Sequence, residues 1–83
     1  MYTIRITRAA QKELDSLSSV AQTRVRAAID ALADDPRPNS ATQLRGSTAW
    51  RMRVGDYRVV YDIDDIDLVV TVIRVGHRRD VYR

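Results

Sequence analysis

The stretch WRMRVGDYRVVY, residues 50–61, constrains the fold most, because it contains a complete β-hairpin. Two runs rich in β-branched and aromatic residues flank Gly55-Asp56, a dipeptide that suits a two-residue turn. Such a turn pairs Val54 with Tyr57 and Trp50 with Tyr61. Because side chains alternate between the faces of a strand, one face collects the large apolar residues. We expect this face to be a core, formed by Trp50, Met52, Val54, Tyr57, Val59 and Tyr61.

The opposite face of the same hairpin carries Arg51, Arg53, Arg58 and Val60. The pairing sets Arg53 directly against Arg58, and like charges in that position cost roughly a few tenths to 1 kcal/mol. An anion would remove this cost, so the pattern predicts an anion-binding face. The alternative is a solvated face whose arginines lean apart, and a longer, bulged turn would shift the register and disperse the cluster.

A third strand is expected at residues 68–75, after an Asp-rich turn at 64–67. A register that sets Ile63 opposite Leu68 adds three residues to each face. The core face gains Leu68, Val70 and Val72, and the arginine face gains Val69, Thr71 and Ile73. The DIDDID run at this turn lacks the glycine and the distal glutamate of a calcium loop, so we interpret it as a solvated turn and expect no metal or cofactor.

The N-terminal half predicts one strand and two helices. Residues 2–6 alternate as a half-buried strand does, and Thr7 suits the N-cap of a helix that runs to about Leu17. Ser19 and Gln22 have the spacing of a capping box, which places the start of a second helix at Ser19. Its apolar stripe consists of Val25, Ala28, Ile29 and Leu32, and Pro36 ends it.

The predicted order is β-α-α-β-β-β, with a loop from Pro36 to Ser47 between the second helix and the hairpin. This is an α+β fold in which a helical hairpin packs on one face of a small, mainly antiparallel sheet. At 83 residues we expect one domain, spanning positions 1–83.

Charge and cysteine content indicate the kind of partner and the compartment to expect. The net charge is +3, and all but one of the fourteen basic residues are arginine, whose forked guanidinium suits phosphate or carboxylate. RNA, DNA and an acidic protein all remain possible partners on this ground. The chain has no cysteine, and it shows neither a signal peptide nor a membrane-spanning run, so we expect a cytoplasmic protein.

Three segments together resemble the RelE branch of the RelE/ParE toxin superfamily. They are LRG at 44–46, WRMRVGDYRVVYDI at 50–63 and VIRVGHRRDVYR at 72–83, and the resemblance extends over the whole chain. It implies the toxin of a type II toxin–antitoxin system that cuts messenger RNA in the ribosomal A site. In that family the 2′-hydroxyl attacks the adjacent phosphate without a metal, leaving a 2′,3′-cyclic phosphate and a 5′-hydroxyl.

The resemblance also implies roles for individual residues. The phosphate-binding and charge-stabilising arginines fall on Arg51, Arg53 and Arg58, the set that the hairpin register had brought together. Arg78 would stabilise the leaving oxygen, and Tyr82 is the candidate base, with His77 as the other possible proton-transfer group. Further RNA contacts are expected from Arg45, His77 and Arg79.

Two departures from the better-known RelE pattern affect these roles. Arg51 and Arg53 stand where lysine is often found, and because arginine is not deprotonated in proteins, a lysine base is excluded at these positions. The segment from Arg78 to Tyr82 is two residues shorter than in some members, which leaves the reach of Tyr82 into the site open.

The resemblance implies a cognate antitoxin whose acidic segment covers the arginine face, and operator DNA as a partner only through the antitoxin complex. Two other functions remain open. A ParE-like toxin would inhibit DNA gyrase without nuclease activity, and a small basic RNA-binding module would have no catalysis. The arginine face joined to a C-terminal Arg and Tyr favours the nuclease.

Overall fold

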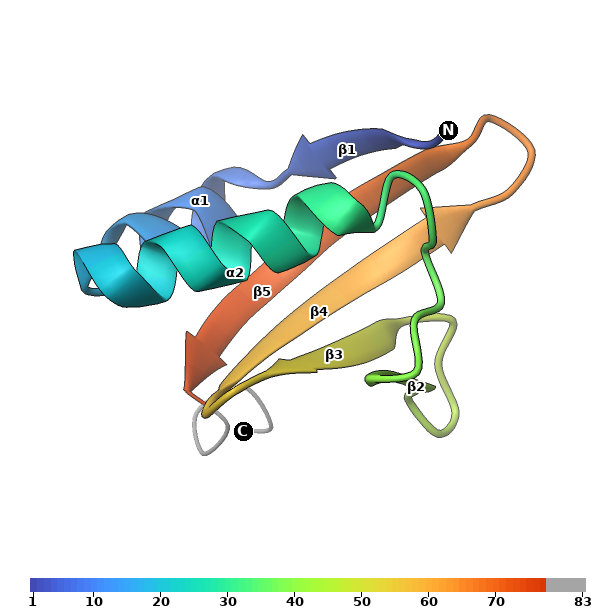
Figure 1. Cartoon of the computed structure of the whole chain (residues 1–83). Coiled ribbons are helices and arrows are strands. Elements are labelled where there is room, and N and C mark those ends of the chain that lie inside the picture. Colours follow the sequence, from blue (N-terminus) through green and yellow to red (C-terminus); the bar gives the residue numbers. More distant parts are fainter. Residues whose placement is uncertain (78–83) are drawn as a thin grey trace.

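The computed structural model describes residues 1–77. Two helices pack on one face of a five-stranded sheet (Figure 1), so the predicted α+β fold is confirmed. The elements are β1 (Thr3–Ile6), α1 (Arg8–Asp15), α2 (Ser19–Ala31), β2 (Ala41–Gln43), β3 (Trp50–Val54), β4 (Tyr57–Asp64) and β5 (Val69–His77). The strand order is β1-β5-β4-β3-β2, with β1 parallel to β5 and all other neighbours antiparallel.

Both helices begin with hydroxyl caps. Thr7 accepts a hydrogen bond from the N–H of Ala10 at 3.1 Å, as predicted. The cap of α2 is Ser18 rather than Ser19, because the extended backbone of Ser18 lets its Oγ accept from the N–H of Ala21 at 3.3 Å. Gln22 closes no capping box with Ser19; its amide donates to the carbonyls of Asp15 and Leu17.

The first helix also ends earlier than predicted, at Asp15 instead of about Leu17. The hydroxyl of Ser16 donates to the carbonyl of Glu13 at 2.7 Å and competes with continuation of the helix. The carboxylate of Glu13 forms an ion pair with Arg74 of β5, with 3.2 Å between Arg74 Nη2 and Glu13 Oε2. It also accepts a hydrogen bond from the backbone N–H of Val75 at 3.0 Å. This ion pair fastens α1 to β5.

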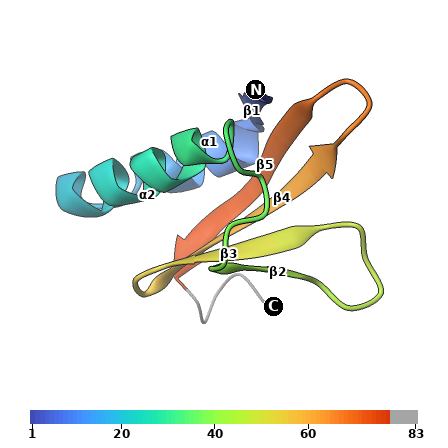
Figure 2. The ribbon, with the colours of Figure 1, turned by 45° about the vertical axis from the view of Figure 1, so that its right-hand side comes forward.

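The core lies between the helical layer and one face of the sheet (Figure 2). The stripe predicted on α2 is confirmed, since Val25, Ile29 and Leu32 are buried, with Ala28 half-buried beside them. The sheet contributes Met52, Val59, Tyr61, Val70, Val72 and Val75. Neither helix among residues 1–77 combines the length and hydrophobicity needed to cross a membrane.

The β3–β4 hairpin has the predicted register. Val54 pairs with Tyr57 and Trp50 with Tyr61, and Gly55 adopts a φ of 59° in the turn, where an L side chain would be strained. The apolar and the arginine faces are therefore divided as expected.

The β4–β5 register differs from the prediction by two residues. Ile63 pairs with Val70 rather than Leu68, because Asp64 still belongs to β4 and its carboxylate accepts the N–H groups of Ile66 and Asp67, each at 2.9 Å. A shift of two preserves the faces, so Val70 and Val72 are buried as predicted. Leu68 was wrongly placed in the core: it lies in the turn, with a φ of 56°, and is 42% exposed.

A bulge then changes the pairing along β5. Tyr61 pairs with Val72, but Val60 pairs with Arg74, which leaves one extra residue in β5. Val75 is thereby brought opposite Val59 and into the core. The expected loop from Pro36 to Ser47 also contains a strand, β2, which pairs with β3 at the edge of the sheet.

Tyr61 connects this sheet to the segment after α2, and its titration is testable. Its hydroxyl donates to the carbonyl of Pro36 at 2.7 Å, and burial raises its pKa from 10.0 to about 12.

The pKa of Tyr61 is higher in the folded protein than in the unfolded chain. Its contribution to stability is therefore fully present below pH 10 and is lost as pH rises through about 12. We expect Tyr61→Phe to flatten the loss of stability in this window and to cost about 1 kcal/mol at neutral pH. Denaturant unfolding against pH, with tyrosinate absorbance, measures both effects; an unchanged late titration step would contradict the assignment.

Candidate anion-binding site

The arginine face of the hairpin forms a hollow of about 280 Å³. Its walls come from three neighbouring strands and the turn before β2, and they consist of Ser40, Thr42, Arg51, Arg53 and Arg58. The three arginines that the register predicted to lie together do line one hollow. Among residues 1–77 no carboxylate lines it, so its chemistry there is that of a cation cluster with two hydroxyls.

Sheet pairing explains how these side chains converge. Arg53 lies directly opposite Arg58 across β3 and β4, and Arg51 lies directly opposite Thr42 across β3 and β2. Directly opposed residues share a face of the sheet. The hollow is therefore built on regular strands, which hold side chains in more precise positions than loops do.

Arg58 is the only buried charged residue in the described part of the chain, with 7% of its surface exposed. Its Nη1 donates to the carbonyl of Tyr57 at 3.2 Å, and among residues 1–77 it forms no ion pair. The residue opposite it in β5 is Gly76, which has no side chain to share its charge. A buried guanidinium without a carboxylate is costly, and an anionic ligand would offset that cost.

Two hydroxyl groups, one from β2 and one from the turn before it, complete the hollow, and sequence reasoning missed them. Ser40 and Thr42 were assigned to a loop, because three residues without clear alternation do not signal a strand. Only an indirect signal in the sequence could have predicted β2. The hairpin leaves one edge of β3 unpaired, and consecutive segments of a chain usually lie side by side, so the segment before β3 was the nearest candidate to pair with it.

The structure separates two predicted contact residues from this hollow. His77 pairs with Tyr57 and meets its ring edge-on, with 6.1 Å between centroids, so it lies on the face opposite Arg58. Arg45 is exposed in the turn between β2 and β3 and does not line the hollow. Arg78, Arg79 and Tyr82 lie outside the described residues.

A second group of side chains anchors the segment that leads into β2. Arg37 pairs with Asp65 of the β4–β5 turn at 2.8 Å, and its guanidinium carbon lies 5.5 Å from the centre of the Trp50 ring. The hydroxyl of Tyr2 donates to the same carboxylate at 2.6 Å. Arg37, followed by Tyr2, holds the pKa of Asp65 below its ordinary value. The Asp-rich turn thus fastens the chain segment between α2 and β2 to the sheet.

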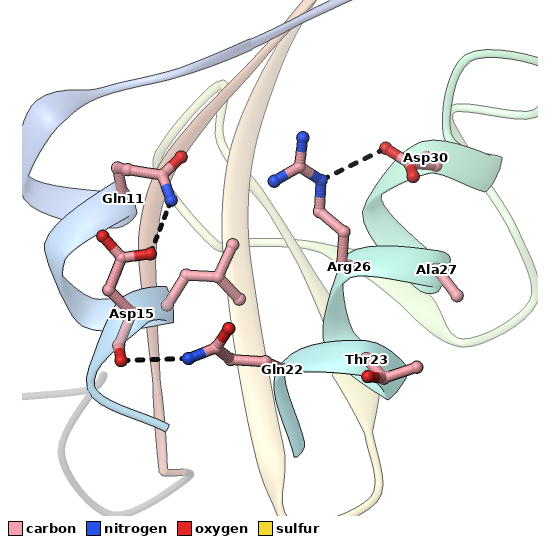
Figure 3. Close-up of a pocket in the computed structure, with 8 residues that line it drawn as sticks. Gln11, Asp15, Gln22, Thr23, Arg26, Ala27 and Asp30 are labelled. Carbon is pink, nitrogen blue, oxygen red and sulfur yellow. Dashed lines mark hydrogen bonds and ion pairs between the residues drawn. The ribbon is translucent and has the colours of Figure 1, made fainter. Parts of the chain in front are cut away.

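A larger hollow between α1 and α2, of about 390 Å³, has a different character (Figure 3). Its polar side chains already bind one another: Gln11 donates to Asp15 at 2.9 Å, and Arg26 pairs with Asp30 at 3.6 Å. It has no cluster of like charges, so the anion site is the hollow on the sheet.

The fold is similar to that of toxins solved in toxin–antitoxin complexes. The RelE–RelB complex of Pyrococcus horikoshii OT3 superposes with a TM-score of 0.84 at 28% identity, covering 95% of this chain and 97% of that one. The intact RelBE complex of E. coli gives 0.81 at 28% identity, over 93% and 96%. The RelBE2 complex of Mycobacterium tuberculosis gives 0.78 at 32% identity, over 93% and 98%. The fold is therefore that of RelE toxins.

Comparison with known sequences identifies the family to which the chain belongs. The model of the ParE toxin of type II toxin–antitoxin systems matches residues 4–82. Toxin RelG of Mycobacterium tuberculosis is 33% identical over 84 residues, which cover 99% of this chain and 97% of the relative. The chain belongs to the RelE/ParE family of type II toxin–antitoxin toxins.

Proposed function

We propose that this toxin is a ribosome-dependent endoribonuclease that cuts messenger RNA in the A site. The observation that supports it best is the hollow of three arginines, in which Arg58 is buried without an acidic partner among residues 1–77. An RNA phosphodiester is an anion that such a cluster would bind. The resemblance of the sequence motifs to RelE toxins implies that the ribosome presents this RNA.

The proposed reaction is an internal transfer at phosphorus. The 2′-oxygen loses its proton and bonds to the adjacent phosphorus, while the bond to the 5′-oxygen breaks and that oxygen takes up a proton. The products are a 2′,3′-cyclic phosphate and a 5′-hydroxyl. Arg51, Arg53 and Arg58 would stabilise the negative charge that builds on the phosphorane oxygens, with Arg58 in a site of low exposure where such interactions are strongest.

Proton transfer would fall to the C-terminal segment. Tyr82 is the proposed base, because the guanidinium groups of the site would favour its phenolate, and Arg78 would stabilise the leaving oxygen. The placement of His77 beside Tyr57, away from the hollow, favours Tyr82 over His77. Arg45, His77 and Arg79 would then bind flanking RNA, and the ribosome would supply the bent geometry that free RNA lacks.

The proposed partner is a cognate antitoxin. RelE toxins of P. horikoshii and E. coli were solved with RelB antitoxins. For this chain we propose that an acidic antitoxin segment covers the arginine face and competes with RNA for it, and that operator DNA is contacted through the antitoxin complex. If glutamine at Arg51, Arg53 and Arg58 left antitoxin affinity unchanged, this mode of inhibition would be wrong.

A second candidate function is inhibition of DNA gyrase, favoured by the match to a family model described as the ParE toxin. Binding to gyrase requires neither a cluster of arginines around a hollow nor a tyrosine in the C-terminal segment, such as Tyr82. These two features are the reason to prefer the nuclease, because the fold is common to both functions.

The deciding experiment uses programmed ribosomes that carry a messenger RNA in the A site. The wild type, Tyr82→Phe and the control Arg26→Ala are compared, with gyrase supercoiling measured in parallel. Arg26 lies on α2, far from the hollow, and pairs with Asp30. We expect cleavage within the A-site codon to a 2′,3′-cyclic end, slowed about 100-fold by Tyr82→Phe, unchanged in the control, and without effect on gyrase. Intact messenger together with inhibited gyrase would establish the second function.

A further inference from the structure

We propose that the hydroxyls of Ser40 and Thr42 are substrate-binding groups of the arginine hollow, where they donate hydrogen bonds to the non-bridging oxygens of the bound phosphodiester. This inference rests on the proposed function, in that the phosphate belongs to RNA. It adds two neutral donors to a site that the sequence motifs assign to arginine alone.

The first argument is alignment across the strands. Thr42 lies directly opposite Arg51, and the N–H of Arg53 donates to the carbonyl of Ser40 at 3.3 Å. Arg53 lies in turn opposite Arg58. Each hydroxyl residue therefore lies next to an arginine of β3, and both line the hollow with the three arginines.

The second argument is that both hydroxyls are available. Both residues are exposed, and no hydrogen bond within the described part of the chain occupies Ser40 Oγ or Thr42 Oγ1. By contrast, the hydroxyls of Thr7, Ser16 and Ser18 are all bound to backbone groups, as caps or helix ends. Free hydroxyls beside a cluster of guanidinium groups are suited to an oxyanion ligand.

The third argument is preorganisation of the segment that carries them. The N–H of Ala41 donates to the carbonyl of Pro38 at 2.9 Å, and Arg37 is fastened to Asp65 and lies over Trp50. The turn before β2 is thus held at both ends. Donors held in place before the ligand arrives lose little conformational entropy on binding.

The guanidinium and hydroxyl donors would have different roles in binding the phosphate. The arginines supply positive charge, and the hydroxyls on the β2 side fix which oxygens face them. Loss of one hydroxyl should weaken binding without removing it, whereas loss of Arg58 should remove most of it. If the two hydroxyls were only solvated groups on an edge strand, their loss would leave phosphate binding unchanged.

The experiment has two readouts on the full chain. In the first, inorganic phosphate is titrated into the free toxin and followed by amide chemical shifts. We expect Ser40→Ala and Thr42→Val each to weaken phosphate binding about tenfold, the cost of one hydrogen bond to a charged group, and Thr42→Ser to restore it. Thr48→Val, at another exposed threonine outside the hollow, is the matched control and should bind as the wild type does.

In the second readout, the same variants are assayed for cleavage on programmed ribosomes. A parallel loss of phosphate affinity and cleavage, with rescue by Thr42→Ser, supports the proposal. Wild-type phosphate affinity in both hydroxyl variants, with cleavage by the wild type intact, would overturn it and leave the nuclease standing. Weakened phosphate binding without any cleavage by the wild type would reject the nuclease and confine the hydroxyls to a simple anion site.

Discussion

Arg58→Met is expected to stabilise the folded toxin by about 1 kcal/mol and to slow messenger cleavage at least 100-fold. The stabilisation has two sources. Methionine removes the repulsion between Arg58 and Arg53, which lie directly opposite each other, and it replaces a buried charge that has no ion pair among residues 1–77. The loss of activity follows because the same charge is proposed to stabilise the phosphorane.

Urea unfolding measures the first effect, and single-turnover cleavage on programmed ribosomes measures the second. Arg5→Met is the matched control, because Arg5 is an exposed arginine in β1, away from the arginine hollow. It should change the unfolding free energy by less than about 0.5 kcal/mol and leave cleavage unchanged. A destabilised Arg58→Met protein would show that Arg58 supports the fold. The interpretation that its charge destabilises the free protein and is neutralised by a bound anion would then be wrong.

Ile29→Ala is expected to lower the free energy of unfolding by about 3 kcal/mol. Ile29 is fully buried in the stripe that joins α2 to the sheet, so truncation removes apolar contacts and leaves a cavity. A domain of this size has only about 4–12 kcal/mol to lose, so the effect is a large share of the total. The hairpin that carries the arginines packs under this stripe, and anion binding should weaken with it as the temperature rises.

Val20→Ala on the same helix is the control for this change. Val20 is 72% exposed, and its truncation should cost less than about 0.5 kcal/mol. Chemical denaturation of both variants, followed by circular dichroism, gives the comparison. Equal effects at the two positions would mean that α2 does not pack on the sheet through the predicted stripe.

Local patterns predicted the centre of this molecule well. Gly55-Asp56 set the β3–β4 register, and that register alone divided Met52, Val59 and Tyr61 from the arginines, as observed. The spacing of Val25, Ile29 and Leu32 likewise identified the buried face of α2. In each case the determining interactions join residues close together in sequence, so a short stretch contains the information.

Predictions that depended on long-range partners were less accurate. Leu68 was assigned to the core by the register of a turn whose length is set by Asp64. The bulge in β5 opposite Val60 and Tyr61 belongs to the pairing of β4 with β5, which no turn motif encodes. The strand β2 exists because β3 offers it a free edge, and no pattern within residues 41–43 marks it. Ser40 and Thr42 therefore entered the candidate site only through the structure.

The sequence by itself determined the α+β class, the order of every element except β2, the hairpin register and the face on which Arg51, Arg53 and Arg58 meet. Only the tertiary structure decided that Arg58 is buried without an acidic partner among residues 1–77 and that His77 lies on the other face. It also decided that β2 and the turn before it bring two hydroxyls to the arginines. The physical reason is that alternation and turn chemistry act between neighbours along the chain. Burial, free hydrogen-bonding groups and charge balance depend instead on which distant strands pack side by side.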